Sequence, residues 1–198
     1  TRRVVDECFQ CKLCYTQCPY TVAEGHEFQL DFPRLMLRAK AIRRRDEGVP
    51  LRERMLADPD RVGRLGTKTA ALANWGNTFG PNRLLMEVVG GIHRSKQLPP
   101  FASETFEAWF AKRAGGRTEL EGEHPVVLFS TCYVNYNKPE VGQAAVRVLQ
   151  HNDCRVACPS VECCGMPALD SGDIELAKKK ARHNVEALAP WVDEGYRI

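Results

Sequence analysis

The sequence predicts an α/β protein of 198 residues, with a helical connector between two parts that contain cysteines. Three observations predict this fold class. Four cysteines fall within residues 8–18, the stretch 26–122 has no cysteine and spaces its apolar residues as helices do, and short apolar runs alternate with helical patterns over 123–198. Strands that alternate with helices are typical of a parallel sheet. We therefore expect three segments, at residues 1–25, 26–122 and 123–198.

The first segment contains the run Cys8-x2-Cys11-x2-Cys14-x3-Cys18, which a proline follows directly. This is the spacing of the ferredoxin-type loops that bind 4Fe-4S clusters. Three closely spaced thiolates can bind one cluster from a single loop, and the fourth cysteine ligates the other cluster in two-cluster ferredoxins. We expect a 4Fe-4S cluster on this loop. Cys18 either completes that cluster or, as we favour, ligates a second one whose own cysteine run precedes Thr1.

Zinc ligation and disulfide bonding are the alternative roles for these cysteines. A structural zinc site commonly takes two cysteine pairs roughly a dozen or more residues apart, which four cysteines within residues 8–18 do not provide. A disulfide framework suits a short secreted chain, whereas this chain has nine cysteines, an odd number, and no signal-like apolar segment at its start. An iron-sulfur cluster is therefore the favoured prediction. Thiols in this number also indicate a reducing compartment, so we expect the cytoplasm or the cytoplasmic face of a membrane.

The middle segment is predicted to be helical. Asp31 can cap a helix that has Pro33 in its first turn and ends at Gly48. The apolar side chains of this helix with near-helical spacing are Leu35, Ala39 and Ile42. Further helices are expected at 51–57, 61–75, 82–89 and 104–113. The basic triplet 43–45 is expected on a solvated helix face, and a docking surface for an acidic partner or for lipid headgroups is the alternative.

The third segment has the order strand, helix, strand, helix and the start of a further strand. Strands are predicted at 126–129 and 155–157, and another begins at 196–198. A helix at 139–150 is predicted from Val141, Ala144, Ala145, Val148 and Leu149, and a later one from Ile174, Ala177, Ala181, Val185 and Leu188. This order predicts an open sheet of parallel strands, which binds ligands beyond the carboxyl ends of its strands.

Cysteines follow both predicted strands. Cys132 lies just past the first strand, and the step Cys163-Cys164-Gly165 lies in the loop after the second. Adjacent cysteines rarely pair with each other because the bridge strains the peptide between them, so this step favours metal ligation. Gly165 permits a close backbone approach or a positive φ beside the metal. We therefore expect a second metal centre at this edge of the sheet.

The single cysteine and the Cys-Cys-Gly step together resemble the CCG cysteine-rich domain of heterodisulfide reductase B subunits and related iron-sulfur oxidoreductases. In that family a motif has an isolated cysteine, the Cys-Cys-Gly step and a closing Cys-x-x-Cys pair, and it usually occurs twice. Here the closing pair would fall at or beyond Ile198, so we expect a truncated first domain. The resemblance implies a second iron-sulfur cluster on Cys132, Cys163 and Cys164.

The whole order of a ferredoxin-type run, a helical connector and a CCG domain resembles the iron-sulfur oxidoreductases that include the C subunits of anaerobic glycerol-3-phosphate dehydrogenases. The resemblance implies electron transfer between a flavin-containing dehydrogenase subunit, or another redox protein, and a quinone or other acceptor. By analogy with disulfide reductases, the CCG-bound cluster acts directly on a disulfide in a second hypothesis. A zinc-stabilised interaction module without redox chemistry is the third.

Composition limits the other functions. The net charge of +3 is too small to indicate nucleic-acid binding, and no apolar run approaches the roughly 18–20 residues that span a bilayer, so membrane contact is expected to be peripheral. No glycine-rich phosphate loop follows a strand, so a flavin or nicotinamide is expected on a partner. Cys154 and Cys158 are expected as small buried residues, with ligation as the less favoured reading.

Overall fold

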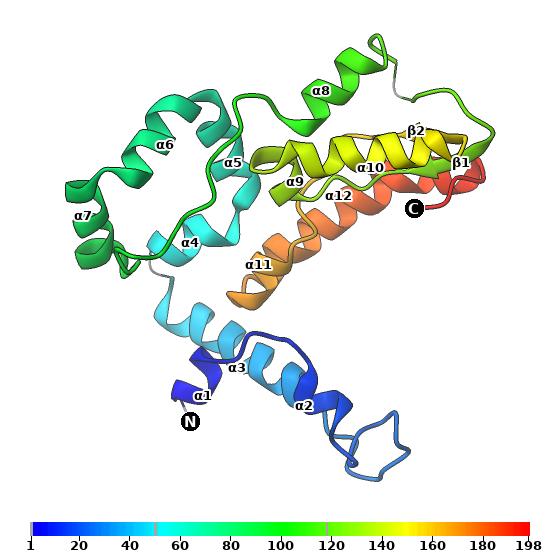
Figure 1. The fold of residues 1–198 in the computed structure, drawn as a ribbon. Helices are drawn as coiled ribbons and strands as arrows, with labels where there is room; N and C mark the ends of the chain where they lie inside the picture. Colours follow the sequence, from blue (N-terminus) through cyan, green and yellow to red (C-terminus); the bar gives the residue numbers. More distant parts are fainter. Residues whose placement is uncertain (1, 50, 118) are drawn as a thin grey trace. The chain divides into compact units, whose positions relative to one another are not determined.

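The structure is a computed structural model, and it describes residues 2–49, 51–117 and 119–198 (Figure 1). The chain divides into two compact units. Unit 1 comprises Thr1–Asp58 and Gly165–Lys179, and unit 2 comprises Pro59–Cys164 and Lys180–Ile198. The chain therefore leaves unit 2 directly after Cys164 and returns to it at Lys180.

Unit 1 is built around helix α3 (Phe32–Glu47), whose ends are those that the sequence predicts. The Asp31 carboxylate accepts a hydrogen bond from the backbone N–H of Arg34 at 2.8 Å, and Gly48 ends the helix with a φ of 76°. Helices α1 (Arg2–Asp6) and α2 (Leu13–Thr16) pack against α3, as does α11 (Met166–Asp170), which also contacts α4 (Leu51–Ala57). The short helices α1, α2 and α11 were not predicted, because one turn carries too few residues for a periodic pattern.

The buried face of α3 differs from the predicted apolar stripe. Met36 and Lys40 are buried, whereas Leu35 is 54% exposed and Ile42 is 47% exposed. Lys40 lies inside because its ammonium group donates hydrogen bonds to a backbone carbonyl and to a carboxylate, described below. The buried face of α3 is therefore determined in part by the hydrogen bonds of Lys40, which the spacing of apolar residues does not reveal.

The arginine triplet of α3 is occupied by ion pairs. The three guanidinium groups of residues 43–45 pair in order with the carboxylates of Asp6, Asp173 and Asp46. The first two of these pairs connect α3 to other parts of unit 1. Arg45 is exposed, as the predicted solvated helix face requires, whereas the side chains of Arg43 and Arg44 are only 27% and 20% exposed, so the prediction is wrong for these two.

Unit 2 contains a small parallel sheet between helices (Figure 1), as predicted. Strand β1 (His124–Val127) pairs in parallel with β2 (Cys154–Ala157), and Val126 lies opposite Val156. A single parallel bridge joins Val126 to Arg197, so a further strand begins where the sequence predicts one. Helix α10 (Pro139–His151) connects β1 to β2, and α12 (Ile174–Asp193) precedes the bridge. Strand β1 starts two residues earlier than the predicted range, and Leu128 still donates to the Ala157 carbonyl at 2.8 Å.

The connector part of unit 2 is helical, with bounds α5 (Pro59–Lys68), α6 (Ala70–Thr78), α7 (Gly80–Gly90) and α8 (Phe106–Arg113). The single helix predicted over 61–75 is two helices. They are divided at Thr69, whose φ of −118° lies outside the helical range and which, like Gly66 and Thr67, has low helix propensity. Across the described part of the chain, no helix combines the length and the apolar character that crossing a membrane requires.

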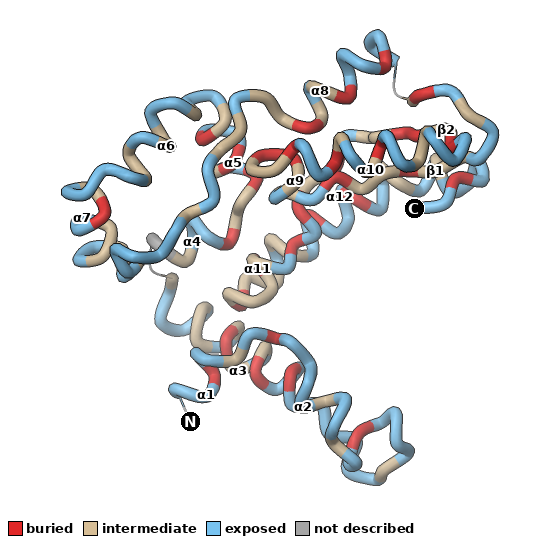
Figure 2. The backbone as a smooth tube through the Cα atoms, viewed as in Figure 1, coloured by how far each residue is buried: buried red, intermediate tan, exposed pale blue. Residues whose placement is uncertain are grey.

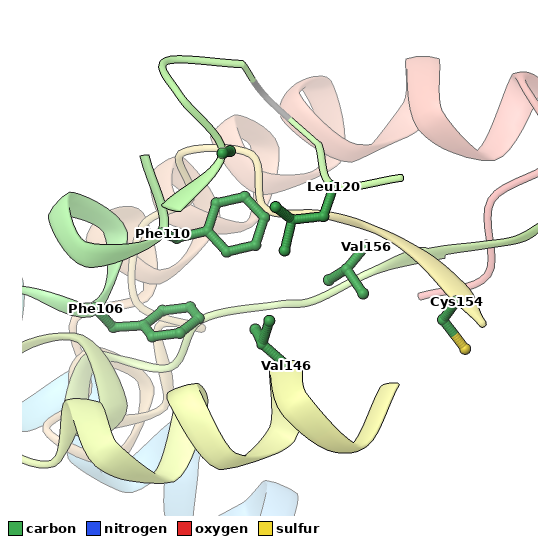
Figure 3. Close-up of a cluster of buried hydrophobic side chains, with 7 residues drawn as sticks. Phe106, Phe110, Leu120, Val146, Cys154 and Val156 are labelled. Atoms are coloured by element: carbon green, nitrogen blue, oxygen red, sulfur yellow. The ribbon is translucent and has the colours of Figure 1, made fainter. Parts of the chain in front are cut away.

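The core of unit 2 lies on both faces of the sheet. On one face Phe106, Phe110, Leu120, Val146 and Val156 form a buried cluster that joins α8, α10 and β2 (Figure 3). Figure 2 marks buried positions in red along the backbone of unit 2. On the other face Val127, Ala157 and Tyr196 pack against Leu188 and Trp191 of α12. The sheet is thereby covered by helices on both sides, which is the arrangement expected of parallel strands.

A glycine determines which face of α10 packs against the core. Val146 is fully buried, whereas Val141 and Val148 of the predicted apolar stripe are 53% and 62% exposed. At Gly142 a Cβ atom would lie 2.6 Å from the Phe106 ring, so the absence of a side chain makes room for that ring. The predicted helix is confirmed, and its inner face is turned towards Gly142 and Val146.

Candidate functional site

The N-terminal cysteine loop lies in unit 1 and is tightly wound. Gln10 and Lys12 adopt φ values of 56° and 60°, a left-handed conformation that is uncommon outside glycine and concentrates at functional sites. The buried Gln10 amide donates to Cys8 Sγ at 3.3 Å, and the ammonium group of Lys40 donates to the Cys8 carbonyl at 2.7 Å. Lys40 also pairs with Asp170 at 2.8 Å. An ion pair between the buried Lys40 and the partly exposed Asp170 therefore holds the backbone at the start of the loop.

The other three cysteines of the run lie further along this loop. Cys11 and Cys14 are exposed, and Cys18 is half-buried. Cys14 and Cys18 line an open groove of about 880 Å³, which also includes Leu30 and Arg38. Thiolates are the protein ligands of iron-sulfur clusters, and the groove leaves space beside two of the four thiols of this run.

The second group of cysteines lies in unit 2 and begins at helix α9 (Cys132–Tyr136). Thr131 caps this helix, and its hydroxyl accepts from the N–H of Val134 at 3.3 Å. Cys132 is thus the first helical residue, in the loop region that follows β1. Helix α9 packs closely on α5, since a Cβ atom at Gly63 would lie 2.3 Å from the Tyr136 ring. This close approach brings the start of α5 near Cys132.

The Cys163–Cys164 step lies next to Cys132. A hydrogen bond from the Cys163 thiol lowers the pKa of Cys132 to about 7, against the opposing effects of burial and of the charges on Asp60 and Cys164. The side chain of Cys163 is 2% exposed, whereas Cys164 is exposed. Gly165 has a φ of 85°, as its predicted role allows. The buried Cys163 thiol and the half-buried Cys132 thiol are therefore neighbours, and the adjacent residue Cys164 is exposed.

A buried polar network holds this step in place. Asp60, at the start of α5, accepts from the backbone N–H of Cys163 at 2.8 Å and pairs with Lys180 of α12 at 2.5 Å. One turn further along α12, Asn184 accepts from the N–H of Glu162 at 2.8 Å and donates to the Glu162 carbonyl at 3.1 Å. None of these three polar residues was singled out from the sequence. Their signal was weak: Lys180 and Asn184 lie four residues apart, on the helix face beside the predicted apolar stripe, whose residues Ala181 and Val185 are exposed.

Behind Cys132 lies a group of buried titratable side chains. Burial raises the pKa of Tyr136 to about 12, and the negative charge of Asp60 adds to the effect. Burial likewise raises the pKa of Glu107, whose carboxylate accepts from Ser130 Oγ at 3.3 Å. The negative charge of Asp60 therefore contributes to the raised pKa values of side chains around the cysteine site.

The environment of Cys158 predicts that the free energy of unfolding falls at alkaline pH. Burial, with the charge of Glu107, raises the pKa of its thiol to about 12, against about 8.5 in an unfolded chain. A raised pKa in the folded state gives stability that is complete below about pH 8.5 and is lost as the pH rises towards 12. Urea unfolding across this range should show a falling free energy of unfolding, and Cys158→Ala should flatten the slope. An equally steep slope in the variant would assign the decline to other groups.

The structure brings some predicted ligands together and leaves others apart. Cys132 and Cys163 are in contact, and Cys8, Cys11, Cys14 and Cys18 share one loop. Among the described residues, no three His, Cys, Asp or Glu side chains are gathered closely enough to hold a single metal ion. The nine cysteines are present as thiols rather than disulfides. Cys154 is buried in β2 and Cys158 is half-buried just past it, in agreement with their predicted packing roles.

Comparison with known proteins points to the same region of the chain. Residues 126–194 match the family model of the cysteine-rich domain, named CCG. The chain is 31% identical over 139 residues to the C subunit of the anaerobic glycerol-3-phosphate dehydrogenase of Escherichia coli (strain K12), and the match covers 70% of the chain. It is also 42% identical over 64 residues, 32% of the chain, to lactate utilization protein A of Bacillus thuringiensis (strain Al Hakam).

These matches cover a limited part of each relative. The chain spans 35% of the length of the glycerol-3-phosphate dehydrogenase subunit and 27% of the lactate utilization protein. No solved structure matches the chain. The cysteine-rich domain match contains Cys132, Cys163 and Cys164, so it coincides with the second group of cysteines.

Proposed function

Because residues 126–194 match the family model of the CCG cysteine-rich domain, we propose that the protein is an iron-sulfur electron-transfer subunit of an oxidoreductase. The single observation that carries the proposal is the contact between the Cys132 and Cys163 thiols, with Cys164 next to them, inside the matched region. Soft thiolate ligands in this arrangement suit an iron-sulfur cluster. When bound, such a cluster accepts and releases one electron at a time.

Each cysteine group has its own role in this proposal. Cys8, Cys11 and Cys14 hold a 4Fe-4S cluster, and Cys18 either completes it or ligates a neighbouring cluster. Cys132, Cys163 and Cys164 hold a second iron-sulfur cluster. Residues 1–25 then act as a ferredoxin-type segment, 26–122 as the connector and 123–198 as the cysteine-rich domain. The buried Gln10 and Lys40 side chains orient the first group through hydrogen bonds to Cys8.

The partners follow from the redox role. One relative, which matches 70% of the chain, is named as a dehydrogenase subunit. This name supports a dehydrogenase subunit with its own flavin as the electron donor for the present protein. A quinone or another redox protein is the acceptor, and the protein acts in the cytoplasm, with peripheral contact to the membrane when the acceptor is a quinone. No nucleic acid takes part.

Iron, sulfide and zinc analysis with EPR spectroscopy on anaerobically purified protein tests the proposal. The wild type should contain iron and sulfide, and Cys11→Ser and Cys163→Ser should each lose a different EPR signal. Cys154→Ser is the matched control, because this buried cysteine lies in β2 outside both groups, and it should keep both signals. Zinc without sulfide in the wild type would instead support a zinc-stabilised interaction module.

Exposure of one thiol favours a second candidate function. Cys164 faces solvent while its neighbour Cys163 is buried, so a disulfide substrate can approach Cys164. In that case the second site reduces a disulfide to two thiols, with two electrons from the proposed dehydrogenase subunit and two protons from water. Disulfide reduction by the protein, lost in Cys164→Ser and retained in Cys154→Ser, would identify this activity.

A further inference from the structure

One carboxylate oxygen joins the cysteine-rich site to the connector. Asp60 Oδ2 accepts from the backbone N–H of Cys163 at 2.8 Å and lies 2.5 Å from the ammonium group of Lys180. The side chains of Asp60 and Lys180 are only 5% and 3% exposed, so neither charge is solvated by bulk water. A buried charge is tolerated when it is paired and hydrogen-bonded, and both conditions are met here.

The same helix holds the peptide on the other side of Cys163. Asn184 is 7% exposed, and its amide group binds both the N–H and the carbonyl of Glu162, with a longer bond of 3.4 Å to the Cys163 carbonyl. Lys180 also lies 3.5 Å from the Glu162 carboxylate. The backbone on both sides of the buried cysteine is therefore fixed by side chains that come from α5 and α12.

The direction of these bonds has an electrostatic consequence. Peptide N–H groups near an iron-sulfur cluster tune its reduction potential, because they can donate to sulfur. Here the N–H of Cys163 donates to the Asp60 carboxylate, which also pairs with Lys180. Removal of the Asp60 charge therefore changes the electrostatic potential at the nearby sulfur atoms.

We infer that Asp60 of the connector helix α5, together with Lys180 and Asn184 of α12, is a positioning residue of the cysteine-rich site. It fixes the Cys163–Cys164 step, and it places a negative charge beside that step. This inference rests on the proposed function for its electrostatic part, because a reduction potential exists only where a cluster is bound. The connector then belongs to the site rather than merely linking two segments.

Three full-length variants test the inference. Asp60→Asn removes the charge but keeps an oxygen that can accept from Cys163. Asp60→Ala combined with Lys180→Met removes the acceptor and leaves no unpaired buried charge. This double variant should therefore fold even if the Asp60→Asn protein fails to fold. Asp193→Asn is the control, because it removes an exposed carboxylate at the far end of α12.

Two readouts are combined on these proteins. In potentiometric EPR titration, Asp60→Asn should move the midpoint potential of the signal that Cys163→Ser abolishes to a higher value, and Asp193→Asn should leave it in place. In hydrogen-exchange mass spectrometry of the peptide containing Cys163, the double variant should exchange about tenfold faster than the wild type, which corresponds to the loss of one hydrogen bond.

The two readouts separate the inference from the proposed function. Wild-type exchange at Cys163 in the double variant, or a wild-type potential in Asp60→Asn, would overturn the role of Asp60. If Asp60 had a purely structural role, Asp60→Asn would contain less iron, but the clusters that remain would keep the wild-type midpoint potential. That result would also count against the inferred role of Asp60. Absence of iron and sulfide from the wild type would refute the proposed function, while hydrogen exchange would still decide whether Asp60 fixes the cysteine step.

Discussion

Replacing Phe106 with alanine is expected to lower the free energy of unfolding of unit 2 by about 3–5 kcal/mol. The Phe106 ring is fully buried and belongs to the cluster in Figure 3, and it contacts α10 at Gly142. Its removal leaves a cavity that the neighbouring side chains cannot fill, because Gly142 has no side chain to reposition. Urea unfolding followed by tryptophan fluorescence measures the loss directly, since Trp109 packs against the same cluster.

Val148→Ala is the control for this prediction. Val148 lies on the same helix that Phe106 contacts, and it is 62% exposed, so its truncation should change the free energy of unfolding by about 0.5 kcal/mol or less. A loss in Val148→Ala comparable to that in Phe106→Ala would show that α10 presents its apolar stripe to the core after all.

Replacing Lys180 with methionine is expected to cost a similar amount, about 3–5 kcal/mol. The substitution keeps the length of the side chain but leaves the buried carboxylate of Asp60 without its cation at 2.5 Å. Breaking one partner of a buried pair is costly because the remaining charge stays desolvated. Chemical denaturation should show the loss, and a second change, Asp60→Leu, should recover part of it by removing that charge.

Lys178→Met is the matched control on the same helix. Lys178 is 62% exposed and pairs with Glu175 on the surface, a kind of ion pair that contributes about 1 kcal/mol at most. The variant should therefore unfold close to the wild type. Equal losses in the two lysine variants would mean that both positions act through helix propensity and that the Asp60 pair adds little.

The chain order of elements could be predicted because each depends on local patterns. The cap at Asp31, the glycine at 48 and the helices with three- and four-residue spacing are read from neighbouring residues. Parallel pairing followed from the alternation of strands and helices. The cysteine groups were found from spacing alone, since the residue types that bind iron-sulfur clusters are few.

What the sequence did not reveal is which face of each helix lies inside. On α3 and α12 the buried positions include Lys40 and Lys180, and a lysine is ordinarily assigned to the surface. Each is buried because a distant aspartate, Asp170 or Asp60, supplies a partner. Such a partner leaves no periodic signal, because the pairing depends on residues more than a hundred positions away in the chain.

The ion pair between Asp60 and Lys180 also has a consequence for the synthesis of the protein on the ribosome. The two residues are separated by 120 positions, and translation adds roughly 5–20 residues per second, so the carboxylate waits on the order of ten seconds for its cation. For most of that interval Cys163 is not yet synthesised, because it lies 103 positions after Asp60 in the chain. Insertion of the proposed cluster at this site would therefore follow the synthesis of α12 and the closing of a long-range contact.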